Sequence, residues 1–438
     1  MQNIENTQKK SNMQKVALTA LAGTSIEWYD FFLYGAAAAL IFPTAFFGEM
    51  PPTTALLLSL LTFAAGFIAR PIGGIIFGHF GDKVGRKKTL ISALMLMGIS
   101  STLIGLLPTY AMIGVAAPIL LTTLRFAQGL AIGGQWGGAM LLVTESAPSN
   151  QRGYYGAFAQ AGAPIGVILA NLALIITSAL VSEEFFNTWG WRIPFLASAV
   201  LILISMYIQL NLEDTDAFKA LVNNKGIQSD ENIKKSPVIE AIKKYPKRIF
   251  LAAGAFLSVQ VTFYILIAFM LAYGVTSANM ARDDMLAAVL IASAIMVPIQ
   301  FVFSSYSDRH GRKGIFMLGA VLTGIWAFAI FPLVDTGNFY LIVLAITGGL
   351  VFLAMMYGPQ AAFFTELFST EVRYSGATLG YQFGAIVGGA FAPTIAVKLW
   401  TEFDIIWVSA YIALASLLTL ISVMALTETY QSDLNNTD

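Results

Sequence analysis

The chain has 438 residues, of which 57% are hydrophobic and only 11% are charged, against about 25% charged in ordinary soluble domains. A soluble protein of this length needs more charged residues to cover its surface. The composition therefore indicates a membrane protein. The formal net charge of zero argues against nucleic acid as a partner. The absence of cysteine excludes disulfides, thiolate metal ligands and a cysteine nucleophile.

Long apolar runs divide the chain into membrane spans. The hydrocarbon core of a bilayer requires about 20 apolar helical residues, and the first apolar run follows too long a polar stretch to be a cleaved signal peptide. We therefore predict an all-α membrane protein with twelve transmembrane helices. They are expected near 16–42, 55–79, 89–107, 113–146, 155–181, 191–211, 249–274, 285–306, 314–334, 339–368, 375–399 and 405–427.

The spans form two sets of six on either side of one long polar stretch. The expected parts are a tail at 1–15, a first half at 16–211, a middle loop at 212–248, a second half at 249–427 and a tail at 428–438. Lysine and arginine gather in the first tail, the middle loop and the even-numbered short loops, so both termini are expected to be cytoplasmic. Within the middle loop, a short amphipathic helix near Val238 is an alternative to the favoured interpretation, a solvated linker.

Short charged segments recur half a chain apart. The segment GHFGDKVGRKK (78–88) returns as SYSDRHGRK (305–313), and ESAPSNQR (145–152) returns as ELFSTEVR (366–373). Such duplication of turns between apolar runs is typical of transporters built from two related halves. Glycines four residues apart, such as Gly162 and Gly166, further predict close contacts between helices.

Four ionisable residues fall inside predicted spans: Glu27 and Asp30 in the first, Arg70 in the second and Arg125 in the fourth. Each is costly in a bilayer and requires a partner or a function. Two interpretations of Asp30 and Arg125 remain. They form a static salt bridge, or Asp30 is a carboxyl group that titrates beside an arginine. The second half offers neutral polar groups instead, which we expect to bind substrate by hydrogen bonds: Gln260, Tyr357, Gln360, Tyr381 and Gln382.

The fourth span carries a polar stripe. Arg125, Gln128 and Gln135 share one helix face, with Trp136 adjacent, so this face is either a cavity wall or an interhelical hydrogen-bond ladder. The cationic group of Arg70 suits a carboxylate substrate. The aromatic residues Trp28, Tyr29, Trp136 and Tyr357 can pack against the carbon skeleton of that substrate. No zinc-ligand spacing, nucleophile elbow or phosphate loop is present, so neither an enzyme nor a metal or cofactor is expected.

These motifs resemble a known family. The turn G-x-x-x-D-x-x-G-R-K (78–87) is similar to the loop signature of the major facilitator superfamily. The segments EWYDFFLYG (27–35), RFAQGLAIGGQWGGA (125–139), TESAP (144–148) and WGWRIPF (189–195) resemble its metabolite:proton symporter subfamily, which includes bacterial carriers for shikimate, α-ketoglutarate, citrate and proline or betaine.

The resemblance implies a monomeric secondary carrier of the bacterial inner membrane that imports a small polar metabolite, most simply an organic acid, together with protons. It makes Asp30, Arg125 and Glu27 candidates for proton coupling. Gln135 is a departure, because the subfamily usually has glutamate there. A proton-coupled exporter and a membrane sensor without flux are the alternatives. A cytoplasmic gate is implied at Asp82, Arg86, Glu145, Arg152, Asp308, Arg312, Glu366 and Arg373.

Overall fold

The computed structural model describes residues 2–84, 86–213, 237–369 and 372–431, with the side chains at 2–12, 78–90, 134–139, 141–142, 146, 208–213, 237–240 and 374 left aside. Within these ranges the chain forms twelve long helical segments, which confirms the predicted all-α architecture. The first six are α1 (Gln2–Leu40), α3 (Pro52–Val84), α4 (Arg86–Leu106), α6 (Ala116–Ser146), α7 (Arg152–Leu180) and α9 (Ile193–Glu213).

The second six segments contain two interruptions. Helix α12 (Pro246–Tyr264) passes through the π-helical turn η3 (Ile265–Phe269) into α13 (Met270–Thr276), and α17 (Arg373–Gly384) passes through η4 (Ala385–Ala390) into α18 (Ala392–Glu402). Such turns often lie at functional sites. The remaining segments are α14 (Arg282–His310), α15 (Arg312–Val334), α16 (Phe339–Glu366) and α19 (Ile405–Ala425).

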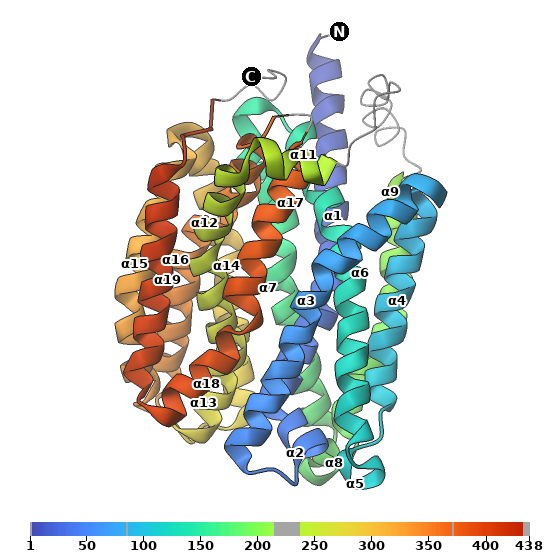
Figure 1. Cartoon of the computed structure of the whole chain (residues 1–438), viewed down its shortest axis with the longest axis vertical. Helices are drawn as coiled ribbons and strands as arrows, with labels where there is room; N and C mark the ends of the chain where they lie inside the picture. The colour runs from blue at the N-terminus through green and yellow to red at the C-terminus, as the bar shows by residue number, and fades with distance from the viewer. Residues whose placement is uncertain (1, 85, 214–236, 370–371, 432–438) are drawn as a thin grey trace.

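Most of these segments can cross a bilayer. In the described ranges, ten helices are long and apolar enough to do so, and α4 contributes a shorter apolar stretch at Ile91–Leu106. Figure 1 shows the helices side by side, with the start of α1 and the end of α19 at one end of the bundle. The short helices α2 (Phe42–Phe47), α5 (Tyr110–Ile113) and α8 (Glu183–Thr188) lie at the other end.

Several predicted boundaries differ from the structure. Helix α1 begins at Gln2, so the first tail is helical, and the fourth span is preceded by the separate turn α5. A short helix, α11 (Pro237–Lys244), occupies the end of the middle loop, where a solvated linker was the favoured interpretation. The reason is packing, because Ala241 of α11 is fully buried against the helical core.

Glycines let the helices approach closely. A methyl group on Gly133 would overlap the backbone carbonyl of Arg70, which joins α6 to α3. On α7, Gly162 and Gly166 leave room for Thr24 and Trp28 of α1. The predicted contact role of the Gly162–Gly166 pair is therefore confirmed, and these contacts hold the charged residues of α1, α3 and α6 close together.

Candidate functional site

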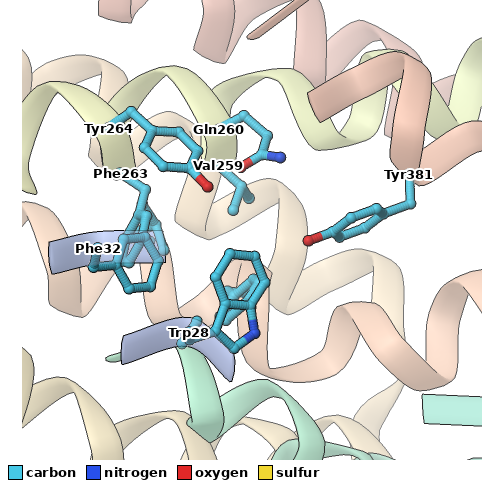
Figure 2. A pocket seen from close by; sticks show the side chains of 10 residues that line it. Trp28, Phe32, Val259, Gln260, Phe263, Tyr264 and Tyr381 are labelled. Carbon is cyan, nitrogen blue, oxygen red and sulfur yellow. The ribbon is translucent and has the colours of Figure 1, made fainter. Parts of the chain in front are cut away.

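A small cavity lies between the two halves, near the middle of the helices (Figure 2). Its volume is about 10 Å³, roughly the space of one water molecule, so the cavity is too small in this structure for a larger ligand. Side chains from both halves line it: Trp28 and Phe32 of α1, Ala163 of α7, Val259, Gln260, Phe263 and Tyr264 of α12, Leu353 and Tyr357 of α16, and Tyr381 of α17.

The lining is aromatic with a few polar groups. Figure 2 shows the hydroxyl groups of Tyr264 and Tyr381 directed toward the space beside Trp28. The Gln260 side chain is 4% exposed, and its amide nitrogen has no hydrogen-bond partner among the described residues. Because unpaired buried polar groups are costly, these groups favour a ligand that has both a flat apolar surface and hydrogen-bonding groups.

Arg70, which was also predicted to bind substrate, lies behind the residues that line the cavity and is not one of them. Its guanidinium lies 5.3 Å from the ring of Trp28 and 4.4 Å from the rings of Phe31 and Phe67. It also interacts electrostatically with the hydroxyl groups of Tyr264 and Tyr381. Within the described residues, Nε and Nη2 of this 1%-exposed side chain have no hydrogen-bond acceptor.

The cavity brings together four of the residues predicted to bind substrate: Trp28, Gln260, Tyr357 and Tyr381. Tyr29 points elsewhere, because its hydroxyl donates to the carbonyl of Pro194 at 2.8 Å. Three aromatic lining residues that sequence reasoning did not assign follow helical spacing from assigned ones. Phe32 lies one turn after Trp28, and Phe263 and Tyr264 lie one turn after Gln260.

Other predicted substrate residues lie off the cavity lining. Gln128 is bonded within the first half, as described below, and Gln382 is a buried residue outside the lining set. Gln360 accepts a hydrogen bond at 3.4 Å from Gln160 of α7, which also donates to the carbonyl of Tyr357 at 3.2 Å. Sequence reasoning missed Gln160, and no local pattern marks it. The side chains of Gln135 and Trp136 lie outside those that the structure describes.

Asp30 and Arg125 lie close together in the first half, but they do not form a direct ion pair. Arg125 Nη1 donates to Gln128 Oε1 at 3.0 Å, and Gln128 Nε2 donates to the hydroxyl of Ser101 at 2.7 Å. Ser101 in turn interacts with the Asp30 carboxylate, which also accepts a hydrogen bond from Ser198. The static salt bridge considered above is therefore wrong for this state. Glu27, the third predicted coupling residue, is a partly buried side chain of α1.

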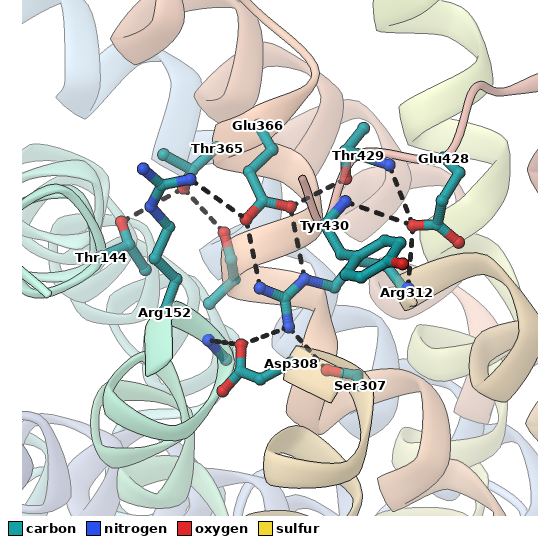
Figure 3. Close-up of polar contacts among 12 residues, drawn as sticks. Thr144, Arg152, Ser307, Asp308, Arg312, Thr365, Glu366, Glu428, Thr429 and Tyr430 are labelled. Carbon is teal, nitrogen blue, oxygen red and sulfur yellow. Dashed lines mark hydrogen bonds and ion pairs between the residues drawn. The ribbon is translucent and has the colours of Figure 1, made fainter. Parts of the chain in front are cut away.

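A charge cluster joins the halves at the end of the bundle where α1 begins (Figure 3). Arg312 binds Glu366 through two contacts of 3.1 and 3.3 Å and Asp308 through one of 2.7 Å. Asp308 also accepts hydrogen bonds from the backbone N–H groups of Gly153 (2.8 Å) and Tyr154 (2.9 Å) at the start of α7. The second half thus caps a helix of the first.

The two repeated Glu–Arg pairs exchange partners across the interface. Arg152 of the first half lies 3.8 Å from Glu366 of the second, and Glu145 of the first lies 3.3 Å from Arg373 of the second. Of the remaining predicted gate residues, Asp308 and Arg312 belong to the same cluster. The side chains of Asp82 and Arg86 lie outside those described.

The tail after α19 extends the charge cluster, which sequence reasoning missed. Glu428 accepts hydrogen bonds from the backbone N–H groups of Arg312 and Lys313, both at 2.9 Å. The hydroxyl of Thr429 donates to Glu366 at 2.8 Å. An acidic residue directly after the last apolar run was the available signal, but nothing local relates it to residues more than one hundred positions earlier.

Polar contacts also join the halves at the opposite end of the bundle. Arg282 of α14 donates to Ser178 of α7 at 2.8 Å and to Asn187 of α8 at 3.2 Å. Ser178 donates to Asp283 at 2.9 Å. The two halves therefore touch on both sides of the cavity.

Comparisons with known proteins agree with this arrangement. The sequence model described as the Major Facilitator Superfamily matches residues 20–378. The chain is 40% identical to the inner membrane metabolite transport protein YhjE of Escherichia coli, covering 97% of this chain and 96% of that protein. It is 38% identical to the shikimate transporter of Escherichia coli, covering 94% and 93%. It is 33% identical to the proline/betaine transporter of the same organism, covering 91% and 80%.

Solved structures share the fold. A crystal structure of a D-xylose-proton symporter superposes with a TM-score of 0.76 at 16% identity, covering 96% of this chain and 99% of that one. The xylose transporter XylE from Escherichia coli, in a partially occluded inward-open conformation, superposes with a TM-score of 0.69 at 17% identity, covering 97% and 100%. At this identity the likeness establishes the arrangement of helices.

Proposed function

Because this chain belongs to the Major Facilitator Superfamily, we propose that it is a proton-coupled symporter that imports a small organic acid by alternating access. The observation that carries the substrate class is Arg70, a buried cation beside the central cavity with two unpaired N–H groups among the described residues. An uncompensated buried charge is strongly unfavourable. A substrate carboxylate would compensate it, because a guanidinium can bind a carboxylate through two parallel hydrogen bonds.

The rest of the cavity supports a compact carbon skeleton. The rings of Trp28, Phe32 and Phe263 offer flat apolar surfaces, and aromatic faces pack well against a ring or an aliphatic skeleton. Gln260 and the hydroxyl group of Tyr381 offer hydrogen bonds to substrate hydroxyl groups. Shikimate, the substrate in the name of one relative, combines a carboxylate, a ring and hydroxyl groups, so this class of acid fits the lining.

Asp30 is the proposed proton carrier. It is fully buried, one of its carboxylate oxygens has no hydrogen-bond partner among the described residues, and Arg125 lies near it without forming an ion pair. Buried carboxyl groups inside membrane helices are common members of proton relays. Arg125 and Glu27 complete the proposed coupling group.

The two ends of the bundle would open in turn. Each opening would expose the cavity to a different side of the bacterial inner membrane. We infer from the distribution of lysine and arginine that both termini, and with them the charge cluster, lie in the cytoplasm. Arg312, Glu366 and their partners would then form the cytoplasmic gate, which is closed in this structure. The two halves of one chain contribute all the proposed parts, so a monomer is sufficient for transport.

The test is uptake into membrane vesicles with an imposed proton gradient, using labelled shikimate, proline and glycine betaine. We expect an inwardly directed proton gradient to drive accumulation of the acid. The Asp30→Asn variant should lose accumulation but keep exchange across the membrane, because an amide cannot carry a proton. Full accumulation by Asp30→Asn would remove Asp30 from coupling. Gradient-driven efflux would indicate an exporter, and binding without flux would indicate a sensor.

A further inference from the structure

Asp30 has close polar neighbours that no sequence pattern marked. Ser198 of α9 donates a hydrogen bond to one carboxylate oxygen, and both side chains are fully buried. The other oxygen, Oδ2, has no hydrogen-bond partner in the described part of the chain. A hydroxyl donor favours the ionised form of a carboxyl group over the protonated form. Ser198 is therefore placed to influence the pH at which Asp30 binds a proton.

Gln128 links Arg125 to Ser101, a neighbour of Asp30. Its amide oxygen accepts a hydrogen bond from Arg125 Nη1, and its amide nitrogen donates one to the hydroxyl of Ser101. One N–H group of the arginine is therefore bonded to a neutral side chain. Arg125 Nε and Nη2 remain without acceptors among the described residues. The guanidinium lies between 4.1 and 4.6 Å from three rings, those of Phe31, Tyr34 and Phe63.

Asp30 and Arg125 thus each have hydrogen-bonding groups without a partner among the described residues. The amide of Gln128 binds the guanidinium of Arg125. Direct contact between a carboxylate and a guanidinium would strongly favour the ionised carboxylate. Keeping the two apart leaves the carboxyl group able to take up and release a proton. A neutral glutamine can do this without adding a second titrating group.

We propose that Ser198 and Gln128 are positioning residues for proton coupling: Ser198 stabilises the ionised form of Asp30, and Gln128 holds Arg125 out of a direct ion pair with it. The inference rests on the proposed role of Asp30 as the proton carrier. The proton affinity of that carboxyl group is then set jointly by the hydroxyl groups of Ser198 and Ser101 and by the amide of Gln128.

Few other titratable groups face this pair. Tyr29 of α1 interacts with Asp30, and Tyr34 of α1, Arg70 of α3 and Tyr264 of α12 interact with Arg125. Glu27 lies about one turn from Asp30 on the same helix. The contacts from α4 and α9 are the neutral hydroxyl groups of Ser101 and Ser198. A change at Ser198 or Gln128 therefore acts on Asp30 without altering a charge.

The experiment is a pH titration of the full-length protein in lipid, with no substrate added. Infrared difference spectroscopy follows the carbonyl band of the protonated carboxyl group, which is assigned to Asp30 by its loss in Asp30→Asn. We expect Ser198→Ala to move the titration midpoint to higher pH by about one to two units, the scale of one hydrogen bond to a charged group. Gln128→Leu should move it to lower pH, because Arg125 is released to pair with the carboxylate.

Two controls separate positioning from folding. Ser198→Thr keeps a hydroxyl donor and should restore the midpoint, and Gln128→Met is a second apolar variant should Gln128→Leu fail to fold. Ser205→Ala removes another fully buried serine of α9 and should leave the midpoint unchanged. Midpoints that do not move, or that move in the same direction in both variants, would overturn the inference. Uptake that ignores the proton gradient would instead refute the proposed coupling itself.

Discussion

The contact between Asp308 and α7 crosses the interface of the two halves, and one amide substitution can weaken it. Asp308 of the second half accepts hydrogen bonds from the backbone N–H groups of Gly153 and Tyr154 in the first. These groups form the first turn of α7, where the helix dipole favours a negative charge. We expect Asp308→Asn to shift the equilibrium toward the state open at this end.

The magnitude follows from the bonds that cross the interface. Hydrogen bonds to a charged group contribute about 1.5–3 kcal/mol each, and neutral ones about 0.5–1.5 kcal/mol. Asparagine keeps one neutral acceptor in place of two charged bonds, so the loss is about 2–5 kcal/mol, which is at least about 30-fold in the equilibrium between states. The pair between Asp308 and Arg312, at 2.7 Å, does not count because both residues belong to the same half and move together.

A reporter cysteine can measure this shift, because the native chain contains no cysteine. Thr365 of α16 is 2% exposed, and its hydroxyl lies 3.3 Å from that of Thr144 across the interface. In a Thr365→Cys background, the rate of labelling by a membrane-permeant maleimide reports the fraction of open molecules. Asp308→Asn should raise this rate by at least about 30-fold.

The matched control is Asp335→Asn. Asp335 accepts a 2.6 Å hydrogen bond from Tyr273. Both residues belong to the second half, so weakening this bond should not favour separation of the two halves. An unchanged labelling rate in Asp308→Asn, or an equal rise in Asp335→Asn, would refute the assignment of the charge cluster as a gate.

Three further substitutions test the packing, the substrate site and the exchanged pairs. Gly133→Ala should reduce the free energy of unfolding by about 1–3 kcal/mol, because the added methyl group meets the Arg70 carbonyl. Gly314→Ala adds a methyl group with no atom within 4 Å and should leave stability unchanged; thermal unfolding measures both variants. Arg70→Lys should weaken substrate binding at least about tenfold in Kd, since an ammonium cannot form two parallel bonds to a carboxylate; equal affinity would make Arg70 structural. Glu145→Gln and Arg373→Gln should be coupled by about 0.5–3 kcal/mol in a double-mutant cycle of maleimide labelling, and additive effects would contradict the pair.

The sequence alone was sufficient for the architecture. Apolar runs of about 20 residues allow one structure in a bilayer, because every backbone polar group must be satisfied within its own helix. The repeated charged turns and the family motifs identified two related halves. Trp28, Gln260, Tyr357 and Tyr381, which the structure gathers around the cavity, were likewise recognised as polar or aromatic groups in apolar spans.

Tertiary structure alone decided which of these groups meet. Glu145 pairs with Arg373 and Arg152 with Glu366, although each glutamate lies seven residues from an arginine of its own segment. Gln128 links Arg125 to Ser101 beside Asp30, and Ser198 of α9 donates a hydrogen bond to the Asp30 carboxylate. Helical periodicity determines which residues share a face. Which face meets which helix depends on the packing of segments more than one hundred residues apart, and no local pattern encodes that choice.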